Sequence, residues 1–324
     1  MEPIFKKLKV LVFANCQATS LVMGLSQCKF LNVDYIINFK WLEEHDSELK
    51  NKSDISFESS FYDCDIFIYQ TLQNSKFQSD YIIENVLKKD CKVVSFSYLY
   101  FLGYFPDYFK SKNNQKTISP EYPFGLFPYE MKIFTQLVLN SKFYEICKEI
   151  IKLNQVPFLD WPFENWLNQN QLFWIQIEDK LSKELDFLDF KGMLDYSIKT
   201  LKEKEIKTDI KLADFILENY KCHKLFDTVN HPSDILLKVL NDAIINFLIC
   251  DKGIHPIYFK EYSFPSGTLD HFQTPILNKV YQNLECTFPL ANSWNFHKKP
   301  ISKRDWLIQN AKFIIQNYDS KYEF

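Results

Sequence analysis

The chain has 324 residues, of which 46% are hydrophobic and 17% aromatic, so it suits one large packed domain or two medium ones and is too apolar for a disordered protein. Its 38 basic and 41 acidic residues give a formal net charge of −3. Nucleic acid is therefore not an expected partner, because recognition of a phosphate backbone needs a basic surface.

Strands and helices alternate in the first hundred residues. Apolar runs predict strands at 9–14, 35–39, 65–69 and 92–96, and apolar residues at helical spacing predict helices at 19–27 and 79–89. The first strand, KVLVFA, is apolar throughout, as is typical of strands buried on both faces of a parallel sheet. This alternation predicts an α/β fold with three layers and an open parallel sheet, of the flavodoxin-like kind.

Helical periodicity dominates after a loop rich in proline and aromatic residues at 103–125. Helices are expected at 130–139, 142–153 and 164–170, through the charged run 199–211, and at 233–248 and 303–317. We interpret residues 129–220 as a large helical insertion in an α/β domain that spans 1–250. Residues 251–324 are expected to form a C-terminal extension packed on the same domain.

Cys16 follows the first predicted strand directly, within the segment Asn15-Cys16-Gln17-Ala18. Open α/β sheets bind ligands at the carboxyl ends of their strands, and the amino terminus of the next helix carries a partial positive charge that lowers a thiol pKa. Cys16 is therefore a candidate nucleophile. The alternative, a small buried hydrophobic side chain, is preferred for the other seven cysteines: Cys28, Cys64, Cys91, Cys147, Cys222, Cys250 and Cys286.

His231 lies between Asn230 and Pro232, just before a predicted helix. The proline restricts the loop, and Asp227 is close enough in sequence to orient the imidazole and stabilise its charged form, as in a catalytic triad. His231 and Asp227 are therefore candidate catalytic residues. The alternative is that His231 only caps the helix or packs. His255 also precedes a proline and is the second candidate among the histidines.

Polar side chains at strand ends and in loops are candidates for binding substrate. Amides at the ends of the first and third strands are suited to donate to an oxyanion, although ordinary loop polarity explains them equally well. Polar-tipped aromatic residues near position 104 are suited to a sugar or adenine pocket, although an aromatic core is the simpler interpretation. The candidates are Asn15, Gln17, Gln70, Thr71, Tyr104, Asp107 and Asn230.

The cysteines are widely spaced and include no CxxC pair, so neither a metal site nor a disulfide framework is expected. We expect no signal peptide, because the first residues are lysine-rich and the apolar run after them is short, and no membrane span, because no apolar stretch is long enough to cross a bilayer. The expected compartment is the reducing cytoplasm. Among the basic residues only Arg304 is an arginine. We therefore expect anionic groups of a ligand to be met by lysines, tyrosines and backbone amides.

The segment VLVFANCQA at 10–18 resembles the glycine-Asn-Cys-Gln signature of the WcbI-type capsular polysaccharide biosynthesis enzymes, with Ala14 in place of the glycine. Further similar stretches are CDIFIYQTL at 64–72, YFLGYFPDYF at 100–109 and the run 208–240, in the family's order and spacing. Phe105 stands where some relatives have a histidine before the proline. The Asn-His-Pro element is fairly specific in combination with Asn-Cys-Gln.

This resemblance implies an acetyltransferase that binds coenzyme A and modifies a sugar of a surface polysaccharide, with a catalytic role for Cys16. The layout is also similar to that of SGNH hydrolases. On this comparison Cys16 of this chain takes the place of the nucleophilic serine, and Gln70 lies near the position of the oxyanion hole. We predict transfer from acetyl-CoA to a hydroxyl or amine of a sugar or nucleotide-sugar, with His231 as base. An esterase or deacetylase with the same residues and a non-catalytic glycan- or nucleotide-binding module remain open. The sequence does not predict the oligomeric state.

Overall fold

The computed structural model describes residues 5–37, 59–71, 79–111, 113, 117–119, 125–154 and 171–318. The chain forms two compact units. The first consists of Met1–Tyr100 with Tyr196–Asp270, and the second of Phe101–Asp195 with His271–Phe324. Each unit is therefore built from two separate stretches of the sequence, and the boundaries differ from the predicted ones at 129, 220 and 250.

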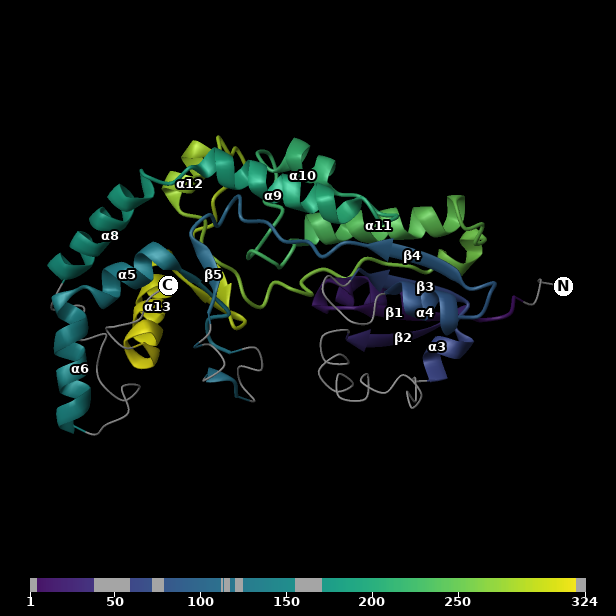
Figure 1. The fold of residues 1–324 in the computed structure, drawn as a ribbon, viewed down its shortest axis with the longest axis horizontal. Coiled ribbons are helices and arrows are strands. Elements are labelled where there is room, and N and C mark those ends of the chain that lie inside the picture. The colour runs from purple at the N-terminus through teal and green to yellow at the C-terminus, as the bar shows by residue number, and fades with distance from the viewer. Residues whose placement is uncertain are drawn as a thin grey trace. The chain divides into compact units, whose positions relative to one another are not determined.

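The first unit contains a sheet of four parallel strands in the order β2-β1-β3-β4 (Figure 1). Its strands are β1 (Leu8–Ala14), β2 (Leu31–Ile37), β3 (Ile66–Gln70) and β4 (Lys92–Phe96). Val10 to Ala14 are all buried, because β1 is an inner strand with neighbours on both sides and helices on both faces. The predicted strands and the open parallel sheet are confirmed.

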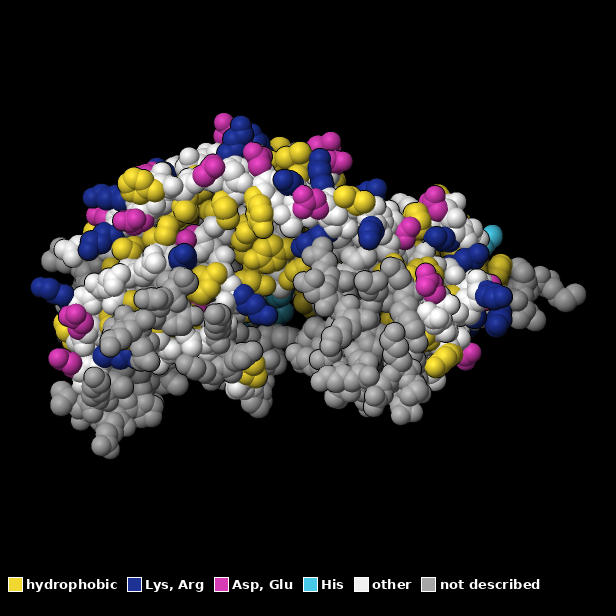
Figure 2. Space-filling model, in the orientation of Figure 1, with side chains coloured by type: hydrophobic (Ala, Val, Ile, Leu, Met, Phe, Trp, Pro, Cys, Tyr) yellow, Lys and Arg dark blue, Asp and Glu magenta, His cyan; other side chains and the backbone are white. Residues whose placement is uncertain are grey.

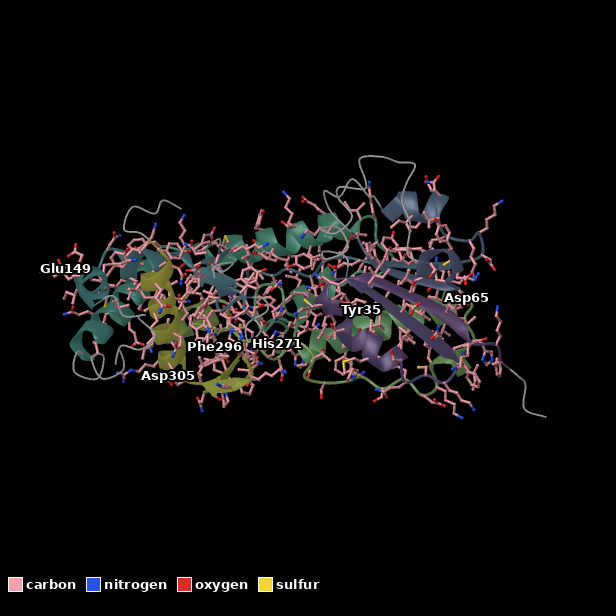
Figure 3. The ribbon with its side chains drawn as sticks, turned by 90° about the horizontal axis from the view of Figure 1, so that it is seen from below. Tyr35, Asp65, Glu149, His271, Phe296 and Asp305 are labelled. Atoms are coloured by element: carbon pink, nitrogen blue, oxygen red, sulfur yellow. The ribbon has the colours of Figure 1, made fainter. Side chains whose placement is uncertain are left out.

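Helices cover both faces of this sheet and make three layers (Figure 3). On one face, α3 (Ser59–Asp63) and α4 (Ser79–Asn85) pack on inward side chains of the strands, which include Phe13 and Phe67. On the other lie α1 (Thr19–Leu25) and α11 (Asp234–Cys250), joined by a buried hydrogen bond of 3.0 Å between the Asn241 amide and Ser20 Oγ. The predicted three-layer α/β fold is therefore confirmed.

The segment after α9 (Phe190–Glu205) corrects one predicted helix. The charged run was expected to stay helical to 211, but Glu205 ends α9 and its carboxylate accepts the backbone N–H groups of Leu212 and Ala213 at the start of α10 (Ala213–Asn219). The intervening Ile210 pairs instead with Phe96 at the end of β4. Capping and strand pairing thus outweigh the helical propensity of the lysine- and glutamate-rich run.

The described part of the second unit is mainly helical, with two short antiparallel sheets of two strands each. Its aromatic core includes Phe127, whose ring lies 5.7 Å from that of Trp306 and 5.3 Å from that of Phe313, centroid to centroid. The paired strands are β5 (Tyr108–Lys110) with β6 (Tyr129–Met131) and β7 (Trp294–Phe296) with β8 (Lys299–Ile301). The helices are α5 (Lys132–Leu139), α6 (Lys142–Asn154), α8 (Gln171–Leu185), α12 (Asn278–Asn283) and α13 (Lys303–Asn317).

The expected C-terminal extension, 251–324, is divided between the two units: residues 251–270 belong to the first and His271–Phe324 to the second. Within the second unit α13 contacts α5 and α6, and Tyr318 after it donates a hydrogen bond of 2.7 Å to Glu130 Oε1. The helices predicted at 142–153 and 303–317 are confirmed, the latter with the same bounds. The helix predicted at 164–170 lies outside the described residues.

Charged side chains of both signs are interspersed over the described surface seen in Figure 2. That arrangement agrees with the nearly balanced composition and differs from the one-sided basic face that typifies nucleic-acid-binding proteins. Among the described helices, none combines the length and the apolar character that a membrane span requires.

Glu130 is a buried carboxylic acid whose titration makes the stability of the second unit depend on pH. Its Oε2 atom has no hydrogen-bond partner among the described residues, and burial raises its pKa from 4.5 to about 7. Burial likewise raises the pKa of Asp107 from 3.8 to about 7, although its carboxylate accepts the Ile133 N–H at 2.7 Å. Both groups hold a proton in the native state at pH values where the unfolded chain has released it.

The free energy of unfolding should therefore fall as pH rises from about 4.5 to about 7 and level off above that range, because the native pKa is the higher one. Glu130→Gln should reduce this slope, since glutamine keeps the acceptor for Tyr318 and does not titrate. Urea unfolding at several pH values measures how the free energy of unfolding depends on pH. Glu178→Gln, at an exposed position of α8, is the matched control. An unchanged slope in Glu130→Gln would contradict the assignment.

Gly24 allows α1 to pack closely against the loop after α11. A Cβ atom there would lie 2.4 Å from Cε2 of Tyr262 and 2.8 Å from the carbonyl oxygen of Ser263. Gly24→Ala should therefore lower the free energy of unfolding by about 1 to 3 kcal/mol, whereas alanine in an unobstructed helix raises it by roughly 0.5 to 1 kcal/mol. Urea denaturation decides the sign, with the exposed Met23→Ala as control.

Candidate functional site

The carboxyl edge of the parallel sheet gathers the polar residues that follow its strands. After β1 the chain continues to β2, which lies on one side of β1 in the sheet, whereas β3 and β4 lie on the other side of β1. The order of the strands therefore reverses between β1 and β3. Ligands of open α/β sheets bind at such a reversal. Asn15 and Cys16 follow β1, and Gln70 and Thr71 end and follow β3. The sequence-based placement of the site at this edge agrees with the geometry.

The Gln17 side chain connects four segments at this edge. Its Nε2 donates to the carbonyl oxygens of Leu99 at 2.7 Å and Asn230 at 2.8 Å. Its Oε1 accepts from the Leu99 N–H at 3.1 Å and from Gln70 Nε2 at 3.0 Å. The side chain is fully buried and all four hydrogen-bonding positions of its amide are used. Gln17 therefore holds the loop of His231 next to the segment of Cys16.

This arrangement changes the role expected of Gln17. We considered it as a substrate or oxyanion ligand, but its side chain has no remaining donor, and its backbone N–H donates to Oδ1 of Asn15 at 2.9 Å. Gln70 is buried too: its Oε1 accepts the Asn15 N–H at 3.3 Å and its Nε2 binds Gln17. In this conformation both glutamines build the framework of the site.

Two amide groups at the edge keep their Nδ2 atoms available. Asn15 uses its Oδ1 to cap the short 3-10 helix Cys16–Ala18, and Asn230 uses its Oδ1 to accept from Thr228 Oγ1 at 3.1 Å. Within the described residues, neither Nδ2 donates a hydrogen bond to protein. Both side chains are half-buried. Among the described residues they are therefore candidate amide donors for a ligand oxygen at this edge.

Cys16 is a protonated thiol at neutral pH. We expected a helix amino terminus to lower its pKa, but burial raises the pKa of Cys16 to about 11, and the favourable contribution of its own backbone N–H is smaller. The three-residue helix Cys16–Ala18 precedes α1 and has too few aligned peptides for a strong dipole. The expected activation of the thiol is therefore wrong, and a nucleophilic Cys16 needs a base.

Tyr35 and Thr19 bind the backbone beside this thiol and were not identified from the sequence. Tyr35 Oη donates to the carbonyl oxygen of Asn15 at 2.5 Å, and Thr19 Oγ1 donates to that of Cys16 at 2.7 Å. Burial raises the pKa of Tyr35, and a negative charge on Cys16 would raise it further. The signal that could have identified Tyr35 is the register of the sheet. Tyr35 of β2 pairs with Val12 of β1, near the carboxyl ends of both strands (Figure 3).

The loop before α11 is fixed by its own backbone and side chains. The Asp227 N–H donates to the His231 carbonyl at 2.8 Å, the His231 N–H donates to Thr228 Oγ1 at 3.1 Å, and Phe226 pairs with Pro232. The Asp227 carboxylate forms an ion pair of 2.7 Å with Lys224 Nζ, a residue that the sequence analysis missed. The orienting role of Asp227 toward the imidazole of His231 stays a prediction.

The remaining candidates have structural roles in this conformation. Tyr104 is buried and its ring contacts Phe101 and Phe288 in the second unit, so the aromatic-core interpretation applies. The Asp107 carboxylate caps α5. The Thr71 N–H, just after β3, donates to the Phe96 carbonyl oxygen at the end of β4. His255 Nδ1 accepts the Ile257 N–H at the start of a 3-10 helix. Within the described residues no three His, Cys, Asp or Glu side chains are grouped as a metal site.

Comparison with known proteins identifies relatives in sequence and in structure. The family described as "Polysaccharide biosynthesis enzyme WcbI" matches residues 9–138 and 166–250, which include Cys16 and His231. A solved structure of WcbI, "a novel polysaccharide biosynthesis enzyme", described as native protein without a disulfide bond between coenzyme A and a cysteine, matches with a TM-score of 0.59. It is 17% identical and covers 96% of this chain and 91% of that chain. No curated protein matches.

Replacing Gln17 by methionine tests its role at the carboxyl edge. Gln17→Met keeps most of the volume but leaves the Leu99 and Asn230 carbonyls and the Gln70 amide without their partner, so the free energy of unfolding should fall by roughly 2 to 4 kcal/mol. Urea denaturation measures the change. Gln27→Met, at an exposed position after α1, is the control. Equal stability of Gln17→Met and wild type would show that the four hydrogen bonds contribute little.

Proposed function

The chain belongs to the WcbI family of polysaccharide biosynthesis enzymes, and on that premise we propose that it transfers the acetyl group of acetyl-CoA to a hydroxyl or amine of a sugar. The observation that carries the proposal is the position of Cys16: a half-buried thiol at the ligand-binding edge of the sheet, in the segment that Gln17 joins to Asn230. The donor, acetyl-CoA, and the acceptor, a sugar or nucleotide-sugar, are substrates.

Coenzyme A suits this edge for two reasons. The description of the similar WcbI structure mentions a disulfide between coenzyme A and a cysteine, as absent from that form, so the thiol end of the cofactor is relevant to a cysteine of the family. In this chain Cys16 is the cysteine at the carboxyl edge. We therefore place the thioester of acetyl-CoA against Cys16, in the proposed complex.

The carbonyl oxygen of the thioester needs donors when it becomes an oxyanion. The Gln17 N–H is occupied by Asn15 Oδ1, so it is an unsuitable donor in this conformation. The Nδ2 groups of Asn15 and Asn230 and the backbone N–H of Cys16 are better candidates, because they lie at the same edge and the two Nδ2 atoms make no other hydrogen bond among the described residues.

A base is required because Cys16 is protonated at neutral pH. We assign this role to His231, whose ordinary pKa lies near neutrality and whose loop is tied to Gln17. In the covalent route His231 takes the proton of Cys16, the thiolate attacks the acetyl carbonyl, and coenzyme A leaves as a thiol after receiving that proton. The sugar hydroxyl or amine then attacks the acetyl-cysteine while His231 takes its proton, and Cys16 leaves as a thiol after receiving that proton.

In the direct route the sugar attacks the thioester itself while His231 takes its proton, coenzyme A leaves as a thiol after receiving that proton, and Cys16 only positions the donor. The two routes differ in one observable. An acetyl group on Cys16, detected by mass spectrometry after incubation with acetyl-CoA, supports the covalent route. Asp227, paired with Lys224, is proposed to stabilise the charged imidazole in either route.

His231→Gln should lower acetyl transfer by about 10² to 10⁴-fold while acetyl-CoA still raises Tm, because the base is lost and the binding surface stays. Cys16→Ala should abolish transfer in the covalent route. The measurements are coenzyme A release with a panel of sugars and nucleotide-sugars and a thermal shift with acetyl-CoA. The matched controls are Cys222→Ala and His223→Gln, at two adjacent exposed positions, and both should leave transfer unchanged.

Three results would redirect the proposal. Acetate release from an acetylated sugar without coenzyme A would indicate an esterase or deacetylase with the same residues. Sugar or nucleotide binding that survives both substitutions, without transfer, would indicate a binding module. Full activity of both Cys16→Ala and His231→Gln would remove the site assignment altogether.

A further inference from the structure

Two cysteines lie in contact at the opposite end of the sheet. Cys64 precedes β3 and Cys91 precedes β4, and their Sγ atoms are 3.6 Å apart. The backbone fixes this proximity, because the Lys92 N–H donates to the Asp65 carbonyl at 2.9 Å and so aligns the starts of the two strands. Asp65 marks this amino end of the sheet, away from Tyr35 at the carboxyl end (Figure 3). The pair is therefore separate from the proposed active site.

The geometry requires only a small movement for the two sulfurs to bond. A disulfide has an S–S length of about 2 Å, so the atoms must approach by roughly 1.5 Å, which rotation of side chains next to a loop is able to supply. Cys64 is buried, whereas Cys91 is half-buried and within reach of a small reagent. Both residues lie just outside their strands, where the backbone has more freedom than in the ladder.

The surroundings also favour a thiolate on the pair. The thiol of Cys91 is placed to donate to the sulfur of Cys64, and that hydrogen bond, together with the charge of Lys88, lowers the pKa of Cys64. The same contact raises the pKa of Cys91. The Lys88 ammonium is held here by Asp65 Oδ1 at 2.5 Å. The pair therefore loses its first proton more readily than an isolated buried thiol.

We propose that Cys64 and Cys91 are a redox-active dithiol, a modification site that closes to a disulfide when a small-molecule disulfide such as glutathione disulfide is present. The pair first loses one proton, and the remaining proton can pass between the two sulfurs across their contact. When that proton moves to Cys64, the Cys91 thiolate, on the accessible sulfur, attacks glutathione disulfide, forming a mixed disulfide and releasing one glutathione thiolate. The released glutathione thiolate takes the proton of Cys64, and the Cys64 thiolate then attacks the Cys91 sulfur of the mixed disulfide and releases the second glutathione. The two protein thiols are oxidised, and one glutathione disulfide is reduced to two glutathione molecules.

The bond would join the starts of two neighbouring strands, which are already aligned in the native state. A disulfide of this kind restricts the unfolded chain more than the folded one, so it raises stability. Oxidation should therefore increase Tm. It should leave the thiol of Cys16 reduced, because burial raises the pKa of that thiol and, within the described residues, the contact between two sulfurs is the one between Cys64 and Cys91.

The test is to equilibrate the full-length protein in glutathione buffers of increasing disulfide content and then block the remaining thiols with iodoacetamide. Peptide mapping should show one cross-linked peptide containing Cys64 and Cys91, with the mass of two hydrogens lost, and reduction should reverse it. Tm should rise with the fraction oxidised. Recovery of both cysteines as alkylated thiols, or as glutathione adducts without a cross-link, would overturn the proposal.

Two variants and a control keep the outcome interpretable. Cys91→Ser and, separately, Cys64→Ala should each abolish the cross-link and the redox-dependent rise in Tm. Cys222→Ser, at an exposed cysteine, should leave both unchanged. A rise in Tm that persists in both Cys91→Ser and Cys64→Ala would assign the effect to other cysteines and contradict the proposal. The readouts are independent of acetyl transfer, so they do not depend on the proposed function.

Discussion

The hydrogen bonds of the buried Gln17 amide are the interaction on which the carboxyl edge depends. A primary amide has two donor positions and two acceptor positions, and Gln17 uses all of them on Leu99, Asn230 and Gln70. Water does not compete for these bonds, because the side chain is fully buried. One residue therefore aligns the ends of β1 and β3, the segment after β4 and the loop of His231.

Desolvation, more than position in the chain, sets the protonation states in both units. The thiol of Cys16 follows a strand and begins a helix, as an activated cysteine would, yet burial keeps it protonated at neutral pH. Burial likewise raises the pKa of Glu130 and Asp107 to about 7. Cys64 behaves differently, because a second thiol donates to it and Lys88 lies nearby. A neighbouring donor or charge is what activates a buried acid in this protein.

The two ends of one parallel sheet carry different sulfur chemistry for a topological reason. All carboxyl ends meet at one edge, where successive connections leave the sheet and provide loops for a ligand. All amino ends meet at the other, where tight returns from the helices place Cys64 and Cys91 side by side. The first arrangement suits binding and transfer, and the second suits a reaction between two residues of the protein itself.

The sequence by itself determined the parallel α/β sheet, most element bounds and the placement of Cys16 and Gln70 at strand ends, because period and apolar runs are local properties. The tertiary structure decided the rest. Gln17 and Asn230 meet across 213 residues, and Glu205 ends α9 by capping a later helix. The division into two units, the paired thiols and the raised pKa of Cys16 also needed the fold. Long-range pairing and desolvation arise only when distant segments pack together, so no local pattern contains them.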